Sequence, residues 1–172
     1  MSLELKKKPC RITHINVREE KHGEESVTAV DIKVVADMPN TFLDELASGL
    51  RAALYRAEGD GPGETADVDA EHLAVLRYPQ LGEMAWSDKL VAAKITLSGA
   101  SKADGLEAME FEADVNKLSL ALKEGGTVET SFRIQFLPEG NQVGLAAAFL
   151  GKKAKVTIAA VVQPELPPAG AE

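Results

Sequence analysis

Two groups of cationic side chains stand near the two ends of the sequence, at positions 6 to 11 and 152 to 155. Lysine and arginine bind phosphate oxygens through charge-assisted hydrogen bonds, and clusters of them are the residue type expected against a nucleic-acid backbone. Together the two groups predict a local phosphate-binding patch. The predicted nucleic-acid-binding residues are Lys6, Lys7, Lys8, Arg11, Lys152, Lys153 and Lys155.

Catalytic and metal-binding patterns are missing from the sequence. His14, His22 and His72 are far apart and match no metal-ligand spacing. Cys10 is the only cysteine, which excludes a cysteine-based zinc site and a disulfide within one chain. No nucleophile-elbow, Walker or dinucleotide-binding glycine pattern occurs. We therefore expect no catalytic residue, no metal and no cofactor, and we expect His14 to be a half-buried residue on the strand face of Ile12.

The overall composition limits the partners that the chain can attract. A formal net charge of -8 disfavours general attraction to nucleic acids or anionic membranes, so a nucleic-acid site must be a local basic patch on an acidic body. An aromatic content of 5% argues against a surface built from base-stacking platforms. No run approaches the roughly 18 apolar residues of a membrane span, and no signal peptide is recognisable. We expect a cytoplasmic protein with no membrane partner.

The strongest structural pattern is a hairpin over residues 106–137, with a turn at Gly125-Gly126. From Val128 to Phe136, apolar and polar residues alternate with the period of a half-buried strand. On the first arm the apolar residues change from odd to even positions at Asn116-Lys117, which predicts a β-bulge. The outward residues of the hairpin form a face too acidic for nucleic acid. These residues are Glu110, Glu112, Asp114 and Glu129.

Strands and helices elsewhere complete one predicted domain. Further alternating runs predict strands, and Asn40 and Asn141 each precede a stretch with helical spacing of apolar residues. These elements predict an α+β fold, mainly an antiparallel β sandwich or partly open barrel, with about seven strands and two helices. The expected strands outside the hairpin cover residues 11–17, 27–36, 72–78, 91–97 and 154–162.

The segments outside the regular elements have their own composition. Residues 1–9 are basic and predict a flexible N-terminal arm. Residues 10–162 form the globular domain, interrupted near 57–70 by a glycine-rich acidic loop that we expect to be disordered. The proline-rich residues 163–172 predict a disordered tail.

Two aromatic residues mark a possible protein contact. Tyr78 and Trp86 belong to a predicted loop, where aromatic side chains make good contact anchors at low entropic cost. Alternatively, Trp86 closes the edge of the core. The sequence leaves both interpretations open.

Three segments carry a resemblance to a group of known proteins. They read RITHINVREEKHGEE, VTAVDIKV and KEGGTVETSFRIQF, and with them the chain resembles uncharacterised small proteins encoded by tailed bacteriophages and prophages. The resemblance implies an accessory role in DNA metabolism, a virion component or an inhibitor of host defence. It carries no catalytic residues over to this chain.

The sequence therefore predicts a non-enzymatic, phage-type accessory protein that binds single-stranded DNA in replication or recombination, in the cytoplasm of a bacterial host. The alternative is a structural or protein-binding module, which binds a host or phage protein or forms an oligomer. Such a module would use an exposed strand edge or the loop of Tyr78 and Trp86.

Overall fold

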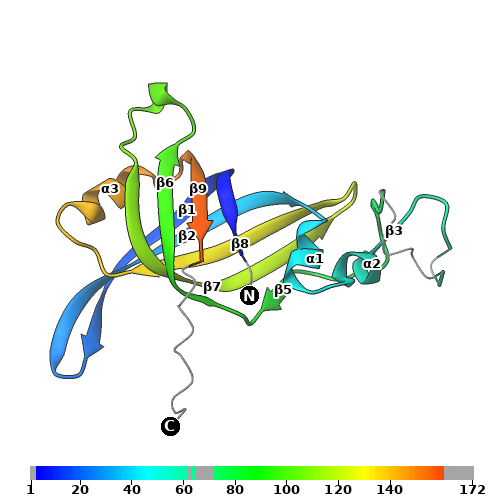
Figure 1. Cartoon of the computed structure of the whole chain (residues 1–172), viewed down its shortest axis with the longest axis horizontal. Helices are drawn as coiled ribbons and strands as arrows, with labels where there is room; N and C mark the ends of the chain where they lie inside the picture. The colour runs from blue at the N-terminus through cyan, green and yellow to red at the C-terminus, as the bar shows by residue number, and fades with distance from the viewer. Residues whose placement is uncertain (1–2, 62, 65–71, 161–172) are drawn as a thin grey trace, which may run out of the picture.

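The computed structural model describes residues 3–61, 63–64 and 72–160. Within them a seven-stranded sheet is antiparallel at every pairing, and six of its strands close into a barrel in the order β7-β6-β9-β1-β2-β8 (Figure 1). Strand β5 pairs with β7 outside the closed ring. This confirms the predicted β-rich α+β fold. The strands are β1 (Leu5–His22), β2 (Glu25–Pro39), β5 (Met84–Trp86), β6 (Leu90–Gly99), β7 (Met109–Lys123), β8 (Thr127–Phe136) and β9 (Lys153–Ala159).

Alternation along the strands fills the barrel with apolar side chains. On β8, every second residue from Val128 to Phe136 is buried, as the sequence predicts. Phe111 of β7 meets Phe136 with ring centroids 4.2 Å apart. Side chains from β1, β6 and β9 fill the rest of the interior, so polar residues of the same strands lie on the outer face. Any ligand site must therefore lie on the outside of the barrel or beyond its ends.

The predicted bulge in the long hairpin is confirmed. The register of β7 against β8 shifts between Asn116 and Ser119, and Lys117 has a φ of 52°. This extra residue lets Leu118 and Leu120 return to the buried face after the parity change. The turn glycines Gly125 and Gly126 have φ values of 87° and 81°, the left-handed conformation expected of them.

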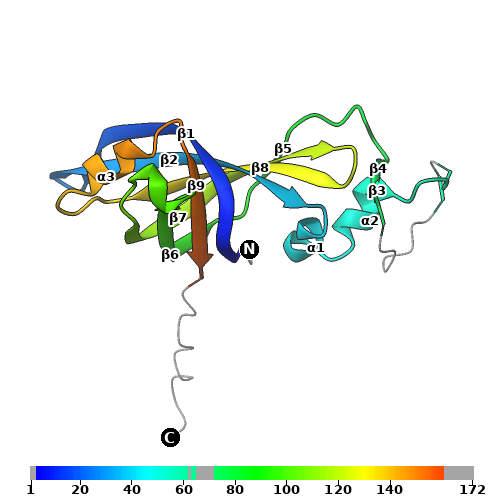
Figure 2. The ribbon, with the colours of Figure 1, turned by 90° about the horizontal axis from the view of Figure 1, so that it is seen from above.

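Beyond the barrel the β7–β8 hairpin is extended and covered by short helices (Figures 1 and 2). The one helix expected after Asn40 is broken into two, because helical geometry ends at Ala47, whose φ of -152° and ψ of 129° are extended, and a second short helix begins after Gly49. Asn40 does not cap it, because its side chain donates to the carbonyl of Leu73. The second expected helix follows Asn141. The remaining elements are α1 (Phe42–Leu46), α2 (Leu50–Leu54), β3 (Tyr55–Arg56), β4 (Val75–Leu76), the 3-10 helix η1 (Lys102–Asp104) and α3 (Gln142–Ala148).

Tyr55 ties this covering layer to the hairpin turn. Its side chain is fully buried, and its hydroxyl lies 2.9 Å from the carbonyl of Lys123 and 3.0 Å from that of Thr127. We expect Tyr55→Phe to lower the free energy of unfolding by about 1–2 kcal/mol, because the two carbonyls lose the hydrogen bonds from this buried side chain. Urea unfolding measures the change. Tyr78→Phe is the matched control, since Tyr78 is 55% exposed; equal stabilities for both variants would contradict the role of Tyr55.

The prediction of a flexible basic arm is wrong for residues 3–9. Leu3 and Leu5 are buried in the core, and β1 starts at Leu5 and pairs with β9. Two leucines among the lysines anchor the segment, and the backbone N–H of Lys7 donates to Thr157 Oγ1 at 3.0 Å. The expected tail at 163–172 and half of the expected disordered loop near 57–70 lie outside the described residues. Within the described ranges, no helix has the length and apolar character needed to cross a bilayer.

Candidate nucleic-acid interface

The pairing of β1 with β9 brings the two predicted cation groups together. Arg11 stands directly opposite Lys153, and Pro9 stands opposite Lys155. Directly paired residues of antiparallel strands have Cα atoms about 5 Å apart. Arg11 and Lys153 are 142 positions apart in the sequence. The pairing of their strands makes the two clusters neighbours on the outer face of the barrel.

A groove opens where β1 leaves β2. The two strands pair up to Arg11 opposite Val35, and the earlier residues of β1 pair only with β9. The resulting depression encloses about 490 Å³. We call it the basic groove, and its charged lining residues are Lys8, Arg11, Lys153 and Lys155, together with Asp37 and Glu129.

The cations of the basic groove have no ion-pair partner among the described residues, since no carboxylate of these ranges lies within ion-pair distance of the four side chains. The two acids on the opposite wall are held elsewhere, since Lys123 Nζ lies 2.8 Å from Glu129 and 3.5 Å from Asp37. The groove therefore has one cationic wall available to an anion and one acidic wall.

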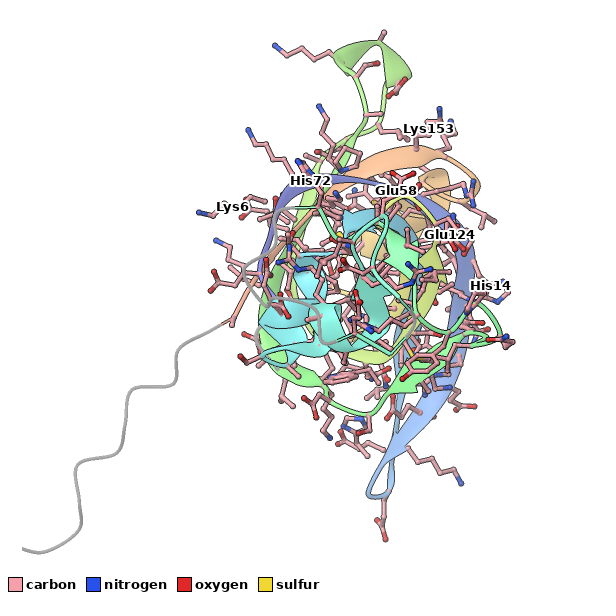
Figure 3. The ribbon with its side chains drawn as sticks, turned by 90° about the vertical axis from the view of Figure 1, so that its right-hand side faces the viewer. Lys6, His14, Glu58, His72, Glu124 and Lys153 are labelled. Atoms are coloured by element: carbon pink, nitrogen blue, oxygen red, sulfur yellow. The ribbon has the colours of Figure 1, made fainter. Side chains whose placement is uncertain are left out.

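Three of the predicted cations lie outside the groove. Figure 3 shows Lys6 projecting at the left of the molecule, away from Lys153 at the top and opposite His14 at the right. Lys7 occupies a register irregularity of β1 with a φ of 46°. The pKa of Asp104 is lowered by hydrogen bonds from Ser101 and, less strongly, by the charge of Lys152, which places Lys152 beside the loop after β6. The predicted site is therefore smaller than its seven residues.

Cys10 lies beneath the basic groove and takes no part in chemistry there. Its side chain is buried, and burial raises the pKa of the thiol to about 12. At neutral pH the group is a protonated thiol, which is a poor nucleophile.

A second set of cations crosses the barrel next to the basic groove, and the sequence analysis did not identify it. His14 of β1 pairs with Lys33 of β2, Lys33 pairs with Arg133 of β8, and Arg133 pairs with Asn116 of β7, beside Lys117. His14, Lys33, Lys117 and Arg133 line a pocket of about 350 Å³. We call these four residues the cationic row; three of them are cations, and His14 adds an imidazole.

The expectation for His14 is wrong. A register shift between Ile12 and His14 places Ile12 in the core and His14 on the outer face, where it is exposed. Without the irregularity, the period of two would have kept both residues on one face. A periodic sequence pattern therefore could not place this residue.

A buried carboxylate orients the arginines of this surface. Asp31 accepts a hydrogen bond from Arg18 Nε at 3.0 Å and lies 3.8 Å from Arg133 Nη1. Arg133 Nε donates to Asn116 Oδ1 at 2.8 Å. The hydrogen bond that Arg18 donates to Asp31 raises the pKa of Arg18, which stays charged. Arg133 is held through Nε and Nη1 and lines the pocket.

The acidic face expected on the hairpin is divided by the barrel. Glu110 and Glu112 are exposed on β7, and Asp114 accepts a hydrogen bond from the backbone of Ala92 at 3.0 Å. Glu129 lies instead on the wall of the basic groove. The expectation that all four acids lie away from the cations is therefore wrong for Glu129.

The two aromatic contact candidates differ in exposure. Tyr78 is 55% exposed in the loop before β5. Trp86 belongs to β5, packs partly buried against the core, and its Nε1 donates to Asp88 at 3.3 Å. Tyr78 is available for a contact, whereas Trp86 also closes the core edge.

The outer face thus carries a strip of cations over β9, β1, β2, β8 and β7, suited to binding phosphate groups by charge. Over the described ranges, no group of three or more His, Cys, Asp or Glu side chains is arranged to hold a metal ion. Comparison with protein-family models, with curated proteins and with solved structures finds no match to this chain.

Proposed function

We propose that this chain is a non-enzymatic accessory protein of the phage type that binds single-stranded nucleic acid along the basic groove. The observation that supports it is the pairing of Arg11 with Lys153, which converts two distant cation groups into one wall. Four cations without carboxylate partners among the described residues give an anion site on a protein of net charge -8.

The opposite wall of the groove favours a single strand over a duplex. Asp37 and Glu129 face the cationic wall across a depression of about 490 Å³. One phosphate backbone can follow the cations, but a second backbone would approach these carboxylates and be repelled. Within the part of the chain that the structure describes, no aromatic side chain lines the groove. Recognition therefore proceeds through phosphates, with little preference for base sequence.

A salt series on a labelled oligothymidylate tests the proposal. Four phosphate contacts on a single strand predict a slope of about -3 for log K against log salt, and about a 50-fold weaker affinity at 200 mM than at 50 mM. Fluorescence anisotropy measures both. The proposal fails if the oligonucleotide does not bind at 50 mM salt, or if a duplex of the same length binds more tightly.

A protein-binding module remains the second candidate, and one observation favours it. Strand β5 is the edge of the sheet, and Tyr78 and Leu81 before it are 55% and 41% exposed. An exposed edge with neighbouring apolar side chains can accept another strand. Multi-angle light scattering separates the candidates: a stable oligomer that Tyr78→Ser dissolves supports this one, and a monomer at all concentrations removes self-association.

A further inference from the structure

We propose that the pocket at the cationic row is a discrete seat for one phosphate monoester, such as the 5′-terminal phosphate of a bound strand or a free phosphate ion. The part of this inference that concerns a bound nucleic-acid strand rests on the proposed function. The phosphate site itself can be tested without a nucleic acid. The pocket encloses about 350 Å³ and is lined by side chains of β1, β2, β7 and β8 together with Glu83 from the loop before β5.

Backbone irregularities in the two flanking strands direct side chains into this pocket. The shift after Ile12 turns His14 outward, and the bulge in β7 adds Lys117, the extra residue with a φ of 52°. Lys33 and Arg133 occupy the regular strands between them. Bulges re-aim side chains and recur beside functional sites. Here two of them place His14 at one end of the row and Lys117 at the other.

Arg133 is held in place at the pocket. Its Nε donates to Asn116 and its Nη1 lies 3.8 Å from Asp31, while Nη2 has no partner among the described residues. The arginine side chain is 27% exposed and lines the pocket. A guanidinium fixed in this way can donate from Nη2 to a phosphate oxygen with little loss of side-chain entropy. Ser131 adds a hydroxyl donor at the pocket wall.

The charges of the pocket favour an anion. Its lining carries three cations, Lys33, Lys117 and Arg133, against two carboxylates, Asp31 and Glu83, which leaves an excess of one positive charge. Arg18 contacts Asp31 at 3.0 Å but also Glu20 at 3.0 Å, so it adds nothing to this excess. A terminal phosphate monoester offers three free oxygens to the cations, whereas an internal phosphodiester offers two.

The pocket also lies where a nucleic-acid strand that leaves the basic groove would end. Arg11 pairs with Val35, and His14 pairs with Lys33 only two residues further along β2. Two residues of a strand span about 7 Å. A nucleic-acid strand that follows Lys155, Lys153 and Arg11 therefore reaches the cationic row directly.

The test compares oligothymidylate carrying a 5′-phosphate with the same oligomer carrying a 5′-hydroxyl. We expect the phosphorylated form to bind about 10-fold tighter, and Arg133→Lys to remove most of that preference by losing the planar fork. Lys117→Gly should weaken it as well, and glycine accepts the φ of 52° without strain. Lys94→Ala, a cation on the outer face of β6 that pairs with Glu110, is the matched control.

Inorganic phosphate provides a second, independent arm. Titration followed by amide NMR should shift signals of Lys33, Ser131 and Arg133, and the shifts should be absent in Arg133→Lys. Equal affinity for the two oligomers with phosphate shifts present would assign the seat to free phosphate. Equal affinity without phosphate shifts overturns the proposal. If neither oligomer binds but phosphate shifts appear, the proposed function fails and the seat stands.

Discussion

The double variant Arg11→Glu, Lys153→Glu should bind single-stranded oligothymidylate about 100-fold more weakly than the native chain at 50 mM salt. The two residues face each other across β1 and β9 and form the centre of the cationic wall. Each substitution removes a charge-assisted contact to phosphate and adds a repulsive carboxylate, and two such contacts account for about this loss. The salt slope should fall by about 1.4, since each single-strand contact contributes about 0.7.

A variant with the same change in net charge separates this local effect from general repulsion. Lys21 is exposed on the far part of the β1–β2 hairpin, and Lys89 is exposed before β6; neither lines the basic groove or the pocket of the cationic row. Lys21 lies ten strand residues from Arg11, about 33 Å away. Lys21→Glu, Lys89→Glu should lose less than about 5-fold. Equal losses in the two double variants would mean that the groove is not the site.

An acidic body with a basic strip has consequences for how the protein would act. Net negative charge slows encounters with nucleic acid at long range, and the strip acts only within about one Debye length, roughly 8 Å at physiological salt. Binding of this kind depends on contact geometry more than on attraction from a distance. The neighbouring acids Asp37 and Glu129 add to this dependence on geometry, because they repel an anionic ligand that covers both walls of the groove.

The hairpin and its bulge were predictable because they depend on local order. The period of two between Met109 and Phe136, the change of parity at Lys117 and the turn glycines each involve residues close in sequence. Burial of one face then fixes the register, since a slip by one residue would expose every apolar side chain. The inward residues of β8 follow from the same argument.

The interface was only partly predictable because it depends on pairings between distant strands. The lysine groups indicated a basic patch, but nothing local to Arg11 specifies Lys153 as its partner across 142 positions. The cationic row needs three strand registers at once and a bulge after Ile12 that no glycine or proline marks. The buried position of Leu3 likewise comes from tertiary packing, which overrode the basic composition of the N-terminal segment.

Deletion of Lys117 should destabilise the protein by about 4 kcal/mol, a large part of the roughly 5–15 kcal/mol by which native proteins are stable. Without the extra residue, the segment that follows slips by one position against β8 and its apolar residues turn toward water. Leu118 and Leu120 are both buried, and exposing a leucine costs about 1.5–3 kcal/mol. Strand β5 would lose its partners too, because Met84 pairs with Leu120 and Trp86 with Leu118. Urea unfolding monitored by circular dichroism measures the loss.

Substitution at the same position shows that the length of the strand, and not the lysine side chain, carries this effect. Lys117→Gly keeps the bulge, and glycine suits its φ of 52°. The backbone strain that glycine relieves in the folded state offsets the flexibility that it adds to the unfolded chain. The free energy of unfolding should therefore stay within about 1 kcal/mol of the native value. The side chain of Lys117 is exposed, so its loss removes no packing. A deletion variant as stable as Lys117→Gly would mean that the hairpin turn absorbs the missing residue, and that the bulge does not hold the register of β7.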